Sequence, residues 1–190
     1  MRILVLTNNC GGLYSFRKEV MTAFRDRGDE VIISAPLDEK APDVEKLGFK
    51  LIDTQFNRQG KNPIVDFKLI LHYRKMIKQV DPDVVLTYTI KPNLYGGMAC
   101  QLCHVPQIAN VTGLGVAVEY PGMLQELTML LYKIGMRKTR LTFFQNPDKH
   151  LQTGSGQQVH CRPRLTPYQR LHLSSPPIWT YSGRSPRLLP

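Results

Sequence analysis

Residues 3–16 read ILVLTNNCGGLYSF: a short apolar run, a polar turn with two adjacent glycines, and the start of an amphipathic segment. Leu13, Phe16, Val20 and Phe24 then follow three or four residues apart, and Gly28 stands where a helix would end. This order predicts a buried strand, a tight turn and a helix that packs one face on a sheet.

The same alternation continues along the chain. Residues 62–63, Asn-Pro, are typical of a helix start, and the helix they open carries an apolar face before Asp81-Pro82 ends it. That face comprises Leu69, Ile70, Tyr73, Met76, Ile77 and Val80. A third helix is expected over 121–138, with an apolar stripe of Met123, Leu124, Leu127, Leu130, Leu131 and Ile134. Strands are expected at 3–6, 31–34, 50–53, 84–87, 107–111 and 141–145. Strands and helices in this order predict an α/β fold, a Rossmann-like parallel sheet with helices on both faces.

The last 39 residues differ in composition from the rest. The chain has a net charge of +10, yet residues 152–190 contain five arginines and no lysine, aspartate or glutamate. They also lack an apolar repeat that could pack. We therefore expect a folded domain over 1–151 and a disordered basic tail over 152–190. Such a tail is either a genuine anion-binding segment or the product of an out-of-frame or truncated gene.

The apolar run that follows Arg2 is too short for an export signal, and polar residues and glycines interrupt the uncharged stretch 92–118. We expect a cytoplasmic protein with no transmembrane helix. Lys133, Arg137 and Lys138 near the end of the third helix suit either a solvated helix end or contact with an anionic bilayer at the inner face of the membrane.

Ligands of open parallel sheets bind beyond the carboxyl ends of the strands, so the loops there are the candidate sites. Gly11 and Gly12 could present backbone N–H groups and a helix N-terminus to a phosphate, or form only a tight turn. The spacing matches neither the dinucleotide-binding glycine motif nor the P-loop. Lys91 with Asn93 could bind an anion, and Thr112 and Gly113 could bind sugar hydroxyls near Glu119, although a solvated loop explains these residues too.

Cys100, Cys103 and His104 have the spacing used in haem attachment and in zinc sites. Covalent haem needs export, and structural zinc needs a second ligand pair that Cys10 and Cys161 do not supply. The two closely spaced cysteines fall within an apolar helical stretch, where free cysteines act as small apolar side chains. We therefore predict no metal site.

Four segments together resemble the N-terminal domain of bacterial family 4 glycosyltransferases, which have the GT-B fold: 11–17, 87–97, 108–115 and 143–146. The resemblance implies transfer of a sugar from a nucleotide-sugar donor to a saccharide or polyprenyl-linked acceptor in cell-surface glycan synthesis, without a metal or other cofactor. It places Gly11 and Gly12 beside the donor diphosphate. It places Lys91, Asn93, Thr112, Gly113 and Glu119 in the acceptor cleft, and it identifies no catalytic base.

Enzymes of that family carry a second Rossmann-like domain, which binds the donor, and the composition of residues 152–190 leads us to expect none in this chain. We therefore expect a chain that is inactive alone. One alternative is half of a split enzyme that works with a separate donor domain. Others are a sugar-nucleotide epimerase of the same fold and a basic anion-binding module. Nucleic acid is an unfavoured partner because the tail lacks regularly interleaved aromatic residues.

Overall fold

The computed structural model describes residues 1–54, 63–112 and 122–144. Its centre is a parallel sheet of six strands in the order β3-β2-β1-β4-β5-β6. The strands are β1 (Arg2–Leu6), β2 (Glu30–Ala35), β3 (Lys50–Asp53), β4 (Val84–Tyr88), β5 (Gln107–Val111) and β6 (Leu141–Phe144). All six predicted strands are confirmed. The predicted 152–190 tail lies outside the described residues.

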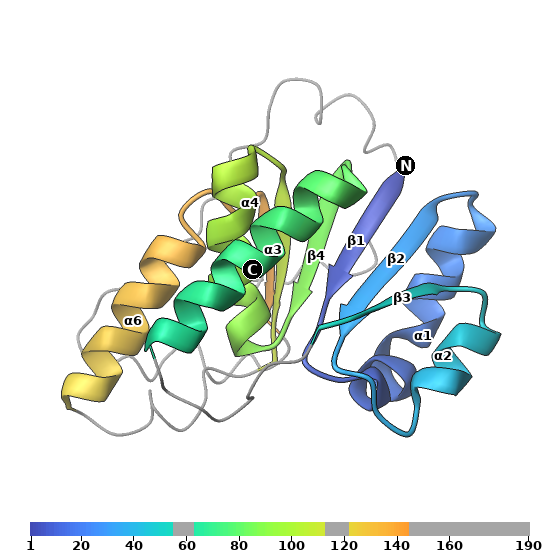
Figure 1. The fold of residues 1–190 in the computed structure, drawn as a ribbon, viewed down its shortest axis with the longest axis horizontal. Helices are drawn as coiled ribbons and strands as arrows, with labels where there is room; N and C mark the ends of the chain where they lie inside the picture. The colour runs from blue at the N-terminus through green and yellow to red at the C-terminus, as the bar shows by residue number, and fades with distance from the viewer. Residues whose placement is uncertain (55–62, 113–121, 145–190) are drawn as a thin grey trace, which may run out of the picture.

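Helices cover both faces of this sheet. The helices α1 (Cys10–Asp26) and α2 (Ala41–Lys46) lie on one face, and α2 is an element that the sequence reasoning did not predict. The other face carries α3 (Pro63–Val80), the π-helical turn η1 (Pro92–Gly96), α4 (Gly97–Cys103) and α6 (Met123–Gly135). In Figure 1, α3, α4 and α6 lie to the left of the central strands and α1 and α2 to the right. Each face has its own apolar core, so the Rossmann-like prediction is correct.

The core face of α3 is the predicted one: Leu69, Tyr73, Met76 and Ile77 are buried. The predicted core face of α1 is partly wrong. Leu13 is buried, but Phe16 and Val20 are 73% and 43% exposed, and Cys10 and Met21 take their places in the core. Arg17 also lies on the inward side of α1, with its guanidinium 5.4 Å from the centre of the Tyr88 ring. The buried face of the helix is therefore displaced from the predicted one.

The predicted stripe of α6 is also partly wrong: Leu131 packs against the core as predicted, but other members of the stripe do not. Met123, Leu127, Leu130 and Ile134 are 87%, 52%, 52% and 46% exposed, whereas Tyr132 is buried. Gly135 lies against η1, where an added Cβ would come within 2.6 Å of the Leu94 carbonyl oxygen. This close approach brings the Gly135 side of α6 onto η1, while Met123, Leu127, Leu130 and Ile134 stay exposed.

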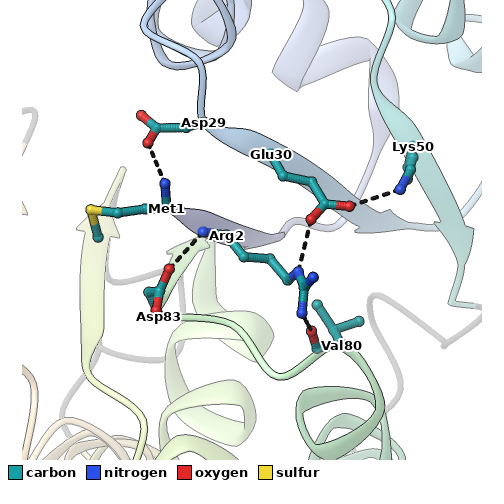
Figure 2. A network of polar contacts seen from close by, with 7 residues as sticks. All are labelled: Met1, Arg2, Asp29, Glu30, Lys50, Val80 and Asp83. Carbon is teal, nitrogen blue, oxygen red and sulfur yellow. Dashed lines mark hydrogen bonds and ion pairs between the residues drawn. The ribbon is translucent and has the colours of Figure 1, made fainter.

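A network of charges joins the strands at the edge where β1 and β2 begin (Figure 2). The Glu30 carboxylate accepts hydrogen bonds from Lys50 Nζ at 2.7 Å and Arg2 Nε at 2.8 Å. A second nitrogen of Arg2 donates to the Val80 carbonyl at 2.9 Å, and the Asp83 carboxylate accepts from the Arg2 backbone N–H at 2.7 Å. These contacts connect β1 to β2, β3 and the end of α3.

The buried thiol of Cys100 belongs to the apolar core, as predicted, and burial raises its pKa to about 12. The Cys103 thiol is half-buried and donates to the Arg74 carbonyl at 3.7 Å. In the described ranges, no group of three or more histidine, cysteine or acidic side chains is arranged to hold a metal ion. No helix among the described residues has both the length and the hydropathy needed to cross a bilayer.

Candidate functional site

A cleft of about 440 Å³ opens at the carboxyl edge of the sheet. One wall is the turn after β1, with Thr7, Asn8 and Asn9, and the first turns of α1. The other wall is the end of β4 together with Thr112, which follows β5. Strand order reverses between β1 and β4, and the crevice at such a reversal is where open α/β sheets bind ligands.

The turn that leads into α1 is held by side chains of the protein itself. Asn9 caps the helix, because its Oδ1 accepts from the Gly12 N–H at 2.6 Å. One carboxylate oxygen of Asp38 accepts from the N–H groups of Cys10 and Gly11, each at 3.0 Å. A Cβ on Gly12 would lie 2.6 Å from the capping oxygen, so a larger residue there would displace the Asn9 side chain from its cap position. The predicted contact of Gly11 and Gly12 with a donor diphosphate stays a prediction.

Arg17 brings a cation to the cleft wall, packed against Tyr88. Burial raises the pKa of the Tyr88 hydroxyl, and the nearby Arg17 charge offsets part of that shift. Arg17 and Tyr88 were not among the predicted site residues. An arginine in the middle of an amphipathic stripe was the signal that could have found this pair.

Thr89 directly follows the last residue of β4 and has a φ of 72°. A β-branched residue seldom adopts that conformation, so the backbone is strained at the cleft wall. Its Oγ1 is buried, and no hydrogen-bond partner for it exists in the part of the chain that the structure describes. Strained, unsatisfied residues cluster at functional sites, which makes Thr89 a third site residue that sequence reasoning missed.

Lys91 does not line this cleft. Its Nζ lies 2.8 Å from Asp66 Oδ1 in α3, and the two side chains are 13% and 15% exposed. The other oxygen of Asp66 accepts from the Tyr95 hydroxyl at 2.8 Å. Burial, reinforced by this carboxylate, raises the pKa of Tyr95. Lys91 therefore joins the start of η1 to α3, and anion binding by it stays a prediction.

Asn93 is 1% exposed and connects β4, β5 and η1. Its Oδ1 accepts from the Thr87 hydroxyl at 2.7 Å, and its Nδ2 donates to the Asn110 carbonyl at 2.9 Å. The Gln107 amide donates to both Thr87 Oγ1 and the Asn93 carbonyl. Of the predicted site residues, Gly12 and Thr112 line the cleft. Gly11, Lys91 and Asn93 do not, and Gly113 and Glu119 lie outside the described residues.

The sheet and the cleft at its strand reversal define a Rossmann-like domain with a ligand-binding crevice at its switch point. The family described as glycosyl transferase 4-like matches residues 2–146, and the chain belongs to that family. A curated relative from Campylobacter jejuni is 30% identical over 151 residues, which are 77% of this chain and 40% of the relative. It is named N,N'-diacetylbacillosaminyl-diphospho-undecaprenol alpha-1,3-N-acetylgalactosaminyltransferase. The chain thus spans about two fifths of that relative's length.

Solved structures confirm the fold at low sequence identity. MurG of Acinetobacter baumannii matches with a TM-score of 0.54 at 13% identity, over 77% of this chain and 42% of that protein. A glycosyltransferase from Rickettsia africae matches with a TM-score of 0.52 at 19% identity, over 74% and 42% of the two chains. A UDP-N-acetylglucosamine 2-epimerase matches with a TM-score of 0.55 at 12% identity, over 76% and 41%. These likenesses show a shared architecture alone.

Proposed function

We propose that this chain forms the acceptor-side part of a glycosyltransferase that moves a sugar from a nucleotide-sugar donor to a saccharide or polyprenyl-linked acceptor in cell-surface glycan synthesis. Family membership over residues 2–146 carries this proposal. The Campylobacter relative's name, which specifies a diphospho-undecaprenol-linked substrate, supports the lipid-linked acceptor.

The chemistry of the cleft suits a sugar that bears a phosphate. Leu13, Phe16 and Tyr88 offer apolar surface for a pyranose ring, while Asn8 and Thr112 offer amide and hydroxyl groups to its hydroxyls. Arg17 adds a cation for a phosphate. We propose that backbone N–H groups and cations, without a metal, stabilise the leaving diphosphate. No carboxylate lines the cleft in the described ranges, so we assign no general base.

We further propose that the 190-residue chain binds the acceptor but needs a donor-binding domain for turnover, whether supplied by a longer form or by a separate polypeptide. Mixing the purified chain with UDP-N-acetylgalactosamine and a short-chain polyprenyl-diphosphate disaccharide should yield no product. Product formation by this chain alone would contradict the dependence on a second domain.

Acceptor binding is tested by NMR titration of the chain with a water-soluble, short-chain polyprenyl-diphosphate N-acetylhexosamine. The shifts are expected around Arg17 and Thr112. Arg17→Gln should weaken binding at least tenfold. Arg25→Gln is the matched control, because Arg25 is on the same helix with its guanidinium 5.9 Å from the Phe49 ring, outside the cleft. Shifts elsewhere, or equal effects of the two variants, would refute acceptor binding in this cleft.

A peripheral membrane contact is part of this proposal. The stripe of Met123, Leu127, Leu130 and Ile134 exposes apolar side chains along one side of α6, and Lys133, Arg137 and Lys138 lie near its end. Apolar surface flanked by cations suits a bilayer with anionic headgroups. Leu130→Ser should reduce flotation with phosphatidylglycerol vesicles. Leu37→Ser, which changes an equally exposed leucine after β2, should not, and equal effects would remove α6 as the contact.

A further inference from the structure

A second hollow lies at the opposite edge of the sheet from the cleft. It measures about 590 Å³ and is enclosed by the end of α4, the turn at 104–106 and the loop 137–140. Figure 1 shows the end of α4 beside the loop that leads from α6 to β6. The hollow is lined by Pro106, just before β5, and the cleft by Thr112, just after it. The length of β5, about 16 Å at 3.3 Å per residue, separates the two.

Three cations line this hollow within four residues of sequence: Arg137, Lys138 and Arg140. No acidic side chain lines it, and within the described ranges none of the three forms a salt bridge. Some exposed cations elsewhere in the described residues do find carboxylates, as Lys50 does with Glu30. The three charges therefore act together on whatever enters the hollow.

The helix dipole does not explain all three charges. Cations are favourable in the last turn of a helix, which accounts for Lys133, and Arg137 follows directly after the C-cap Met136. Arg140 stands after the helix, directly before β6, where the dipole of α6 has fallen off. A ligand with negative charge is a reason that all three cations can share.

The loop that carries the cations is held in place by hydrogen bonds. Gln101 Nε2 donates to the carbonyl oxygens of Ile134 and Gly135, each at 2.8 Å, where α6 ends. The Thr139 hydroxyl donates to Gln107 Oε1 at 2.8 Å, and the Arg140 N–H donates to the Gln107 carbonyl at 2.9 Å. A loop fixed in this way loses little conformational freedom when it binds a ligand.

We propose that this hollow is a binding site for a phosphate or diphosphate group, separate from the acceptor cleft. Two planar guanidinium groups and an ammonium match the oxygens of such a group, since arginine binds phosphate bidentately. The hollow is large enough for a diphosphate with part of the molecule that carries it. That group could belong to a free anion or to a lipid headgroup, and the proposal does not depend on the glycosyltransferase function.

The test compares two double variants with equal loss of charge. Arg137→Gln with Arg140→Gln removes both guanidinium groups of the hollow. Arg27→Gln with Lys46→Gln removes two exposed cations near the α1 and α2 side. Sodium diphosphate is titrated into each full-length protein at constant ionic strength, and the amide shifts of Val105, Thr139 and Arg140 are followed by NMR. In a second arm, binding to phosphatidylcholine vesicles is compared with and without phosphatidic acid.

The hollow variant should lose affinity at least tenfold in one arm, and the control pair should change it less than twofold. Loss in the diphosphate arm identifies a free anion, and loss only in the vesicle arm identifies a lipid headgroup. Equal effects of the two double variants in both arms, or no loss of binding in either arm, would overturn the proposal. Arg140→Gln alone, at an exposed position, repeats the test if the double variant unfolds.

Discussion

The Lys91 ammonium and the Asp66 carboxylate form a largely buried ion pair at 2.8 Å between the start of η1 and the first turn of α3. Lys91→Met should lower the free energy of unfolding by about 2–4 kcal/mol, because Asp66 then keeps a charge without its cation. Urea denaturation measures this loss. Lys91→Met combined with Asp66→Leu should recover part of it. If Lys91→Met alone is as stable as the wild type, the pair does not stabilise the fold, and ligand binding becomes the better explanation of Lys91.

Gly97 faces the Gly135 carbonyl oxygen so closely that a Cβ on Gly97 would overlap it. Gly97→Ala should therefore force α4 and α6 apart and lower the free energy of unfolding by about 1–3 kcal/mol. Gly11→Ala is the control, because its Cβ would meet neighbours only at 3.7 and 3.8 Å. Thermal unfolding distinguishes the two variants. Equal melting temperatures would show that the helices adjust without cost.

The strain at Thr89 predicts a stabilising substitution. Thr89→Gly should raise the free energy of unfolding by about 1 kcal/mol, since glycine adopts a positive φ freely and the unsatisfied hydroxyl is removed. Thr112→Gly should instead lower it by about 0.5–1 kcal/mol, because Thr112 is exposed and is not among the residues with positive φ. Denaturant titrations of both variants check the opposite signs. A loss of stability in Thr89→Gly would mean that the threonine side chain contributes more packing than its backbone costs.

Glu30 makes the stability of the fold depend on pH in the acid range. The hydrogen bonds from Lys50 and then Arg2 lower the pKa of Glu30 from 4.5 to about 2. A depressed carboxylate pKa stabilises the folded state above the unfolded value and loses that effect as the pH falls toward the folded value. The melting temperature of Glu30→Gln should thus lie below that of the wild type above pH 4.5 and converge with it near pH 2. A constant difference across this range would exclude Glu30 ionisation as the cause.

The sheet was predictable because its strands are short apolar runs between turn signals, and β3 and β5 coincide with the predicted ranges. The inward faces of α1 and α6 were harder to predict from the sequence. The apolar periodicity of α6 indicates that the helix has an apolar face, but it does not indicate what that face contacts. Which side packs inward depends on Gly135, a residue without a side chain, and on the close approach of η1 that it permits.

The site was predictable only in part for a related reason. Gly12 and Thr112 directly follow strands, so topology alone brings them to the cleft. Lys91 and Asn93 follow a strand too, but their partners Asp66 and Gln107 lie 25 and 14 residues away in sequence. From sequence alone, a polar residue near a strand end is a candidate ligand-binding residue. Only the fold shows whether its side chain already forms a hydrogen bond or ion pair inside the protein.

The start of α1 is an anion-binding position that the protein's own Asp38 carboxylate already occupies. A ligand phosphate could use the Cys10 and Gly11 N–H groups only in molecules whose Asp38 has swung away, so its apparent affinity scales with that fraction. Exchange of one anion for another keeps the helix terminus satisfied in both the empty and the loaded state. It also makes displacement of the Asp38 carboxylate a condition for an anion to bind at the turn after β1.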